Sequence, residues 1–211
     1  MKKSLKTMAE WIATILVLPA VLLYELGKRL WGPSRAFSGW SQFFGLFPGL
    51  SGIYLRRAFY RWTLSRCDTG ACIGFGTVFS HPAAELGKNV YVGVFSSLGD
   101  VTLEDDVLVG SHVSIMNGAG QHGIERLDVP VRDQSGSWPR VTIGRDAWIG
   151  ERTVVMADVG RHAVVGAGSV VTRPIPEFAV AVGVPARVVR LRSSRAGDAE
   201  RTDFAPTVRS A

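Results

Sequence analysis

The sequence predicts an all-β fold, a parallel β-helix, with an apolar helical region ahead of it. Two patterns support this prediction: apolar residues recur at six-residue intervals from Ile73, and glycine often follows them directly. Neither an α-helix, with a period of about 3.6, nor a strand, with a period of about 2, produces this interval. We expect three parts: residues 1–66 as a membrane-associating segment, 67–192 as the β-helical domain with a loop at 116–142, and 193–211 as a disordered tail.

The repeat forms two blocks with one long interruption between them. Within the blocks, nine of the twelve steps between repeat starts are six residues long. Each repeat is interpreted as one short strand and a turn, and three repeats close a coil of about 18 residues whose first positions point inward. Fourteen starts therefore predict about four to five coils. The starts are Ile73, Phe79, Leu86, Val92, Leu98, Leu103, Val109 and Ile115, then Ile143, Ile149, Val155, Val159, Val165 and Val171.

The composition favours a folded, turn-rich β protein and limits the partners of its basic surface. The chain has 211 residues, of which 24 are glycine, and a net charge of +6. A positive balance suits nucleic acid, an anionic membrane or an anionic cofactor. The sequence lacks the basic and stacking-aromatic motifs of nucleic-acid-binding proteins, so we expect no nucleic-acid partner. Cys67 and Cys72 are expected to stay reduced, because their spacing forms neither a metal framework nor a secreted disulfide scaffold.

An apolar run at residues 11–24 marks the N-terminal region. It is shorter than the about 20 residues of a spanning helix, and Pro19 is expected to interrupt it. The run has a poor signal-peptide cleavage site, and basic residues on both flanks place both ends on the cytoplasmic side. We therefore expect an interfacial or re-entrant hairpin at the cytoplasmic face of the inner membrane. A short or tilted span and an anchor packed on protein are the alternatives.

Aromatic residues and arginines alternate in the segment that follows. Such a segment suits the headgroup boundary of a membrane, where rings are buried and guanidinium groups reach lipid phosphates. The alternative is that the aromatic residues cover the end of the β-helical core, and the two interpretations are compatible. The residues concerned are Phe37, Trp40, Phe43, Phe44 and Phe47, followed by Arg56, Arg57, Arg61 and Arg66.

Three motifs near the end of the repeat resemble the C-terminal signature of hexapeptide O-acetyltransferases. They are Ile-Gly-Arg-Asp-Ala-Trp-Ile-Gly at 143–150, Val-Gly-Ala-Gly-Ser-Val-Val-Thr-Arg-Pro at 165–174 and Val-Gly-Val-Pro-Ala-Arg-Val-Val-Arg at 182–190. That family includes the galactoside, maltose and xenobiotic acetyltransferases, and the whole chain is most similar to members found with bacterial polysaccharide biosynthesis. The resemblance implies a left-handed parallel β-helix, a homotrimer, and acetyl-CoA bound in the groove between neighbouring subunits.

The interruption of the repeat at 116–142 is expected to carry the chemistry. A long insertion in a regular solenoid is usually a functional loop. In related enzymes the catalytic histidine stands at the start of this loop, so the resemblance assigns the role of general base to His122. Relatives often have histidine two positions earlier, where this chain has Gly120. A neutral histidine suits removal of a proton from an acceptor hydroxyl. Asn117 and Asp100 are weaker candidates that would orient His122 or a sugar hydroxyl.

The same resemblance places the cofactor. A tryptophan would flank the CoA groove, and residues with small side chains would let the pantetheine arm lie along the edge of the coils. Arginines would lie near the CoA phosphates, which their forked hydrogen-bond donors suit. The expected acetyl-CoA-binding residues are Trp148, Gly150, Ala167, Thr172, Arg173, Arg187 and Arg190.

The three remaining histidines lie in turns. His81 and His112 are candidates to line the same inter-subunit cleft and to bind substrate, whereas His162 is expected to be solvated. A hexapeptide carbonic anhydrase is a rival on the same fold, but its zinc ligands include two histidines five residues apart. No two histidines of this sequence have that spacing, so we expect no metal.

The sequence therefore predicts an acetyl-CoA-dependent O-acetyltransferase that modifies a sugar hydroxyl of a lipid-linked glycan or exopolysaccharide. The alternatives are a non-catalytic scaffold of a membrane glycan-assembly complex and an N-acetyltransferase acting on an amino sugar. A serine acetyltransferase is a neighbouring option, against which the membrane-seeking N-terminus argues because serine is a soluble substrate.

Overall fold

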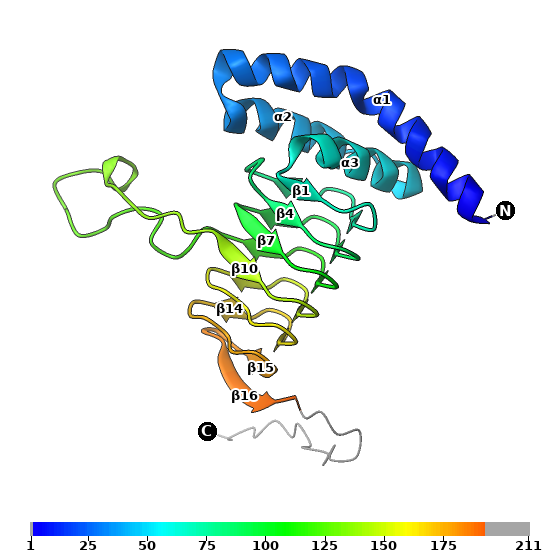
Figure 1. Cartoon of the computed structure of the whole chain (residues 1–211). Helices are drawn as coiled ribbons and strands as arrows, with labels where there is room; N and C mark the ends of the chain where they lie inside the picture. The colour runs from blue at the N-terminus through cyan, green and yellow to red at the C-terminus, as the bar shows by residue number, and fades with distance from the viewer. Residues whose placement is uncertain (1, 193–211) are drawn as a thin grey trace.

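A computed structural model describes residues 2–192 of the chain, with side chains from residue 5, so the expected tail lies outside the described residues. Three helices form a cap over one end of a tapering stack of coils, and a long loop projects from its side (Figure 1). The helices are α1 (Lys2–Trp31), α2 (Pro33–Gly45) and α3 (Gly49–Thr63). The all-β domain therefore begins directly after α3, with β1 (Arg66–Cys67).

The coils present three parallel sheets as the faces of a prism. The first sheet, face A, comprises β1, β4 (Glu85–Leu86), β7 (Val101–Leu103) and β10 (Val141–Ile143). Face B comprises β2 (Cys72–Ile73), β5 (Tyr91–Val92), β8 (Leu108–Val109), β11 (Trp148–Ile149), β13 (Val164–Val165), β15 (Ala179–Val182) and the antiparallel β16 (Arg187–Leu191). Face C comprises β3 (Val78–Phe79), β6 (Ser97–Leu98), β9 (Ser114–Ile115), β12 (Val154–Val155) and β14 (Val170–Val171).

The repeat starts form the core of the prism, as the sequence predicts. All fourteen are at most 2% exposed. The parallel register stacks them in columns, for example Val92, Val109, Ile149 and Val165 on face B. Each coil donates backbone hydrogen bonds to the next, so burial and hydrogen bonding repeat together. The glycine after a repeat start permits this spacing: a Cβ on Gly93 would lie 2.5 Å from the backbone nitrogen of Ser111.

The N-terminal helix is longer than expected and is not a hairpin. α1 continues through Pro19, whose ring lies on the exposed side of the helix. Its inward side carries Ala13, Val17, Val21 and Tyr24, which are buried in the core formed with α2 and α3. Packing of this apolar stripe compensates the one backbone hydrogen bond that proline removes. The prediction that Pro19 interrupts the apolar run is therefore wrong.

The aromatic segment covers the end of the β-helix, as one of the two interpretations predicts. Phe37, Phe44 and Phe59 are buried, and the rings of Phe44 and Phe59 stack with centroids 4.4 Å apart. Ser41 joins α2 to the first coil by accepting a hydrogen bond of 2.9 Å from the backbone N–H of Phe79.

Two of the arginines expected to reach lipid phosphates instead hold the cap on the β-helix. Arg56 is fully buried and donates to the carbonyl oxygens of Ile73 at 2.9 Å and Phe47 at 2.6 Å. Arg57 donates to the carbonyl of Ala71 at 3.1 Å and pairs with Glu10 of α1 at 3.2 Å. The headgroup prediction is therefore wrong for Arg56 and Arg57, because buried backbone carbonyls at the helix ends and first coil need donors.

Cys67 and Cys72 are both free thiols and both are partly buried. Burial raises the pKa of the Cys67 thiol to about 12, so the thiol is protonated at neutral pH.

Candidate active site

The interrupting loop spans residues 116–140 and connects two faces of the prism. It leaves face C after β9 and enters face A at β10, which begins two residues earlier than the sequence predicts. Apart from the short 3₁₀ turn η1 (Val131–Asp133), the described loop has no helix or strand. It extends away from the coils (Figure 1), so its position depends on its two ends.

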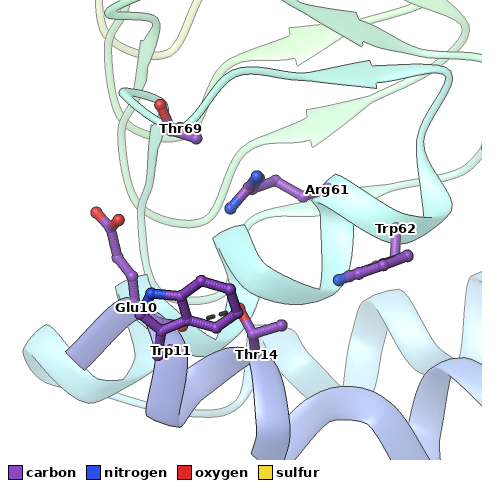
Figure 2. Close-up of a pocket in the computed structure, with 6 residues that line it drawn as sticks. All are labelled: Glu10, Trp11, Thr14, Arg61, Trp62 and Thr69. Atoms are coloured by element: carbon purple, nitrogen blue, oxygen red, sulfur yellow. Dashed lines mark hydrogen bonds between the residues drawn. The ribbon is translucent and has the colours of Figure 1, made fainter. Parts of the chain in front are cut away.

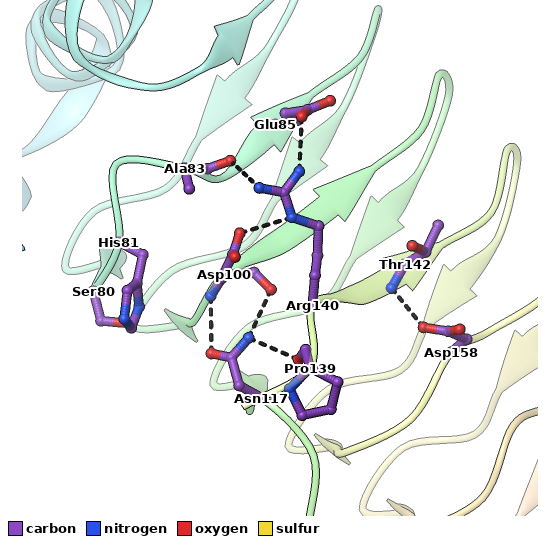
Figure 3. Close-up of polar contacts among 10 residues, drawn as sticks. All are labelled: Ser80, His81, Ala83, Glu85, Asp100, Asn117, Pro139, Arg140, Thr142 and Asp158. Carbon is purple, nitrogen blue, oxygen red and sulfur yellow. Dashed lines mark hydrogen bonds and ion pairs between the residues drawn. The ribbon is translucent and has the colours of Figure 1, made fainter. Parts of the chain in front are cut away.

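Asn117 ties the two ends of the loop together (Figure 3). Its side chain is 4% exposed. Its amide nitrogen donates to the carbonyl oxygens of Asp100 at 2.8 Å and Pro139 at 3.0 Å, while its amide oxygen accepts from the backbone N–H of Asp100 at 3.0 Å. One amide therefore joins the outgoing arm, the returning arm and the preceding coil, an arrangement that satisfies buried polar groups on all three.

Arg140 fixes the returning arm to two earlier coils, a contact that the sequence analysis missed. Its guanidinium lies 2.9 Å from the Asp100 carboxylate and 2.8 Å from that of Glu85, and it donates to the carbonyl of Ala83 at 3.0 Å (Figure 3). The available signal was its position, directly before the apolar residues that resume the repeat. Together Asn117, Asp100, Arg140 and Glu85 form what we call the loop root.

His122 lies on the outgoing arm of the loop and is exposed. Its ring meets that of Trp138 on the returning arm edge to face, with centroids 5.6 Å apart. The backbone N–H of Ser137 donates to the carbonyl of Gly120 at 2.7 Å, which holds the two arms side by side. Trp138 was also missed by the sequence analysis. The hydrogen bonds of Asn117 and the ion pair of Asp100 are made at the loop root, so these candidates position the loop that carries His122.

The other histidines lie at different corners of the prism. His81 accepts or donates a 2.8 Å hydrogen bond with Ser80 through Nδ1, one coil before Asp100 and beside the loop root (Figure 3). His112 occupies a corner between faces B and C with φ of 56° and stacks on Phe95. His162, which was expected to be solvated, is partly exposed, and its Nδ1 lies 2.8 Å from the Asp146 carboxylate. Within residues 2–192, no three histidine, cysteine, aspartate or glutamate side chains gather as metal ligands.

Face B carries an open groove of about 530 Å³ in which two of the expected cofactor residues meet. Trp148, which is half exposed, and Arg190 of β16 both line it. Arg192, at the end of the described chain, adds a second cation there and lies 3.7 Å from Asp146. The groove thus combines an exposed indole with guanidinium groups, which suits a ligand with both aromatic and phosphate parts. Its remaining lining residues are Asp106, Leu108, Ala147, Val164 and Val180.

Four of the remaining cofactor candidates lie at edges of the prism, and the fifth, Arg187, lies on face B. Gly150 and Ala167 stack at the corner between faces B and C, where a Cβ on Gly150 would lie 2.4 Å from the Ala167 nitrogen. Thr172 and Arg173 are exposed at the corner after β14, two coils beyond the loop root on the same edge. Arg187 begins β16 and pairs with Val182.

The groove and the loop root lie on opposite sides of one chain. Trp148 belongs to face B, whereas the loop leaves from the edge between faces C and A, which is the edge opposite face B in a three-sided prism. The chain alone therefore separates the expected base region from two of the expected cofactor residues.

Comparison with known proteins agrees with this architecture. The family model for the hexapeptide repeat of succinyl-transferase matches residues 140–173. The Mycobacterium tuberculosis protein named "Probable acetyltransferase Rv3034c" is 31% identical over 67% of this chain and 50% of its own length. The galactoside O-acetyltransferase of Escherichia coli is 37% identical over 50% of this chain and 52% of its own length. The chain thus spans about half the length of these curated relatives.

A solved structure of galactoside acetyltransferase in complex with coenzyme A superimposes with a TM-score of 0.65 and 26% identity, covering 75% of this chain and 80% of that one. Serine acetyltransferases also match about half of this chain. By its fold, the chain is a left-handed parallel β-helix protein built of hexapeptide repeats. Within that class it is a relative of the hexapeptide-repeat acetyltransferases.

Proposed function

We propose that this protein is an acetyl-CoA-dependent O-acetyltransferase that modifies a hydroxyl group of a sugar. The observation that carries the proposal is the pairing, on this fold, of a histidine-bearing loop with a groove that combines Trp148 and Arg190. The galactoside acetyltransferase with bound coenzyme A supports the choice of cofactor, and the named galactoside O-acetyltransferase supports a sugar acceptor.

In the proposed reaction, His122 takes the proton of the acceptor hydroxyl while the oxygen attacks the acetyl carbonyl. A new ester C–O bond forms, the C–S bond of the thioester breaks, and the proton on His122 passes to the departing CoA sulfur. Trp138 and the loop root would hold the imidazole in place during these steps. Asn117 and Asp100 thereby act as positioning residues for the loop.

For the cofactor, we propose that Trp148 flanks the CoA and that Gly150, Ala167 and Thr172 leave room for the pantetheine arm. Arg190, Arg187 and Arg173 would neutralise the CoA phosphates, because one guanidinium group can donate two parallel hydrogen bonds to the oxygens of a phosphate. His81 and His112 remain proposed substrate contacts, of which His81 is favoured by its place beside the loop root.

The position of these groups supports a site built between subunits of a homotrimer. Because face B and the loop root lie on opposite sides of a chain, the loop of one subunit would reach the groove of its neighbour. A closed, cyclic arrangement of identical subunits repeats one such contact three times.

We further propose that the acceptor is a lipid-linked glycan or exopolysaccharide at the cytoplasmic face of the inner membrane. Among the described residues, α1 is long and apolar enough over Leu5–Trp31 to cross a membrane. A membrane-bound enzyme suits an acceptor held at the membrane, whereas free serine requires no such attachment. An N-acetyltransferase acting on an amino sugar and a scaffold without activity are the competing functions.

The test is an acetyl-transfer assay with the full-length protein in detergent. Release of the CoA thiol from acetyl-CoA is measured with alkyl glycosides, an amino-sugar glycoside and L-serine as acceptors. We expect release with glycosides, loss of release in His122→Ala, and unchanged release in Glu125→Gln, a control on the same loop. Transfer only to L-serine, or only to the amino group of the amino-sugar glycoside, would contradict the O-acetylation of sugars. Absence of acetyl-CoA binding would contradict the whole proposal and favour a scaffold.

A further inference from the structure

The outward side of α1 is apolar along its length. Residues 11–24 contain no charged side chain; Lys6 and Glu10 lie before them, and Glu25, Lys28 and Arg29 follow. Glu10 pairs with Arg57 and Glu25 with Lys28, so Lys6 and Arg29 remain as the cations at the two ends. A soluble surface rarely exposes a continuous apolar patch of this extent without a partner. We call the following side chains, each 39–69% exposed, the outer face of α1: Leu5, Met8, Trp11, Ile12, Ile15, Leu16, Leu18, Leu22, Leu23, Leu26, Leu30 and Trp31.

The inward side of α1 is fixed to the protein. Val17, Val21 and Tyr24 are buried against the other two helices, and Glu10 pairs with the nearly buried Arg57. A helix that crossed a bilayer would have to leave α2 and α3, which would expose this stripe and leave Arg57 without its carboxylate. Since α1 lies flat across the cap (Figure 1), its outer face is the part available to lipid.

Beside the outer face, a cavity of about 460 Å³ opens between α1, α3 and the first coil. Figure 2 shows its six lining residues, with the Arg61 guanidinium directed between Thr69 and the Trp11 ring. Trp11 and Trp62 are 66% and 58% exposed, and such half-exposed indoles are typical of the membrane–water boundary. Glu10 also lines the cavity, but its carboxylate is paired with Arg57, so Arg61 supplies the remaining charge.

We propose that the helical cap docks on an anionic bilayer with α1 lying in the plane of the membrane, and that the cavity holds a phospholipid phosphate against Arg61. The occupant is lipid because the outer face is apolar over residues 11–24, has Lys6 and Arg29 near its two ends, and belongs to a chain with a net charge of +6. This arrangement points the β-helix away from the bilayer and deepens the proposed membrane attachment, but it does not depend on acetyl transfer.

The first test determines whether α1 crosses the membrane. Cysteines are introduced singly as Lys6→Cys and Arg29→Cys in the full-length chain, near the two ends of α1. Sealed inside-out and right-side-out vesicles of the cytoplasmic membrane are treated with an impermeant maleimide, and the unchanged chain gives the background from Cys67 and Cys72. We expect both ends to react in inside-out vesicles only. Reaction of the two ends from opposite sides, or absence of the chain from the membrane, would overturn the proposal.

The second test determines whether the outer face binds lipid. Ile15→Glu combined with Leu22→Glu places two carboxylates on side chains that are 63% and 69% exposed, so the cap should still fold. We expect the double variant to lose flotation with phosphatidylglycerol vesicles while keeping its thermal unfolding midpoint. Leu127→Glu changes a loop side chain that is 99% exposed; it is the control and should float as the unchanged chain does. Continued flotation of the folded double variant, with only its oligomer mass altered, would assign this face to a second copy and overturn the proposal.

The third test addresses the cavity. Arg61→Gln should weaken binding to phosphatidylglycerol vesicles about fivefold, as expected for one cation at an anionic surface, and leave binding to phosphatidylcholine nearly unchanged. Arg132→Gln, an exposed arginine of the loop, should change neither. Equal binding of Arg61→Gln and the unchanged chain to anionic vesicles would overturn the phosphate site, as would an equal loss on both lipids. Because all three tests measure binding or topology, their failure is distinct from a failure of acetyl transfer.

Discussion

The coils and the loop at 116–140 are held in place by different kinds of contact. In the coils each buried apolar residue stacks on its counterpart in the next coil, and the same backbone hydrogen bonds recur at every level. The loop buries almost nothing beyond its first residues and is held at the loop root by single side chains, chiefly Asn117 and Arg140. Stability is therefore distributed in the coils and concentrated at the root of the loop.

This difference corresponds to a difference in role: the coils provide the rigid structure, and the loop carries the proposed base. A flat-sided prism offers faces and edges but few side chains that converge, whereas a loop can place an exposed histidine over a neighbouring surface. Substitutions in the two regions should consequently move different quantities: the free energy of unfolding in the coils, and the rate of transfer in the loop.

The largest effect is expected in the loop. His122→Ala should lower the rate of acetyl transfer about 10²- to 10⁴-fold, the usual contribution of a general base. Because the ring is exposed, the free energy of unfolding should change by less than about 0.5 kcal/mol. Steady-state kinetics and thermal unfolding of the same preparation measure both quantities. Retention of most activity would remove His122 from the mechanism.

In the coils, Ile149→Ala should show the converse result. The side chain is fully buried between Val109 and Val165, so its truncation should cost about 2–5 kcal/mol of unfolding free energy. Chemical denaturation measures the loss, with Glu151→Ala on the exposed turn as the control. A loss below about 1 kcal/mol would mean that the column relaxes around the cavity and that stability is not set by the stacked repeat starts.

Asn117→Ala should affect both quantities, since Asn117 joins the two regions. It removes three hydrogen bonds and leaves buried groups unpaired, at a cost of about 1–3 kcal/mol. The released loop should be cut faster by protease and should transfer acetyl groups more slowly, whereas Arg132→Ala should match the unchanged chain in both assays. Slower transfer with an unchanged rate of cleavage would instead place Asn117 at the substrate.

Arg140→Ala should have the smallest effect. Its ion pairs with Glu85 and Asp100 are about one-third exposed, so solvent screens them and the loss of stability should be about 0.5–1 kcal/mol. Comparison of its unfolding midpoint with that of Asn117→Ala ranks the two contacts. A larger loss of stability for Arg140→Ala would show that the contacts of the returning arm, and not those of the outgoing arm, contribute most to holding the loop in place.

The sequence predicts the coils well because their physical cause is local and repeated. Inward positions such as Ile73 and Val165 must be apolar, and the six-residue spacing makes the pattern visible without any knowledge of contacts. Arg56 and Arg57 offer no such signal: their burial depends on carbonyl oxygens of residues 9 to 17 positions away in the chain. The same holds for α1, whose passage through Pro19 follows from packing on α2 and α3.

The candidate site was predictable in its parts but not in their arrangement. The sequence points to His122 and Trp148 through motifs, yet the opposition of face B to the loop root appears only when three repeats close a coil. Trp138 and Arg140 carry no motif, because an edge contact and a long-range ion pair have no fixed spacing in sequence.

The most direct test of a site shared between subunits is coexpression of two inactive chains. His122→Ala lacks the base, and Trp148→Glu places a carboxylate in the groove. If the loop of one subunit serves the groove of the next, random mixing in a trimer should restore about a quarter of the activity of the unchanged protein, because that fraction of sites combines an intact loop with an intact groove. Activity of the mixture no greater than that of either variant alone would show that loop and groove act within one chain, and would contradict the shared site.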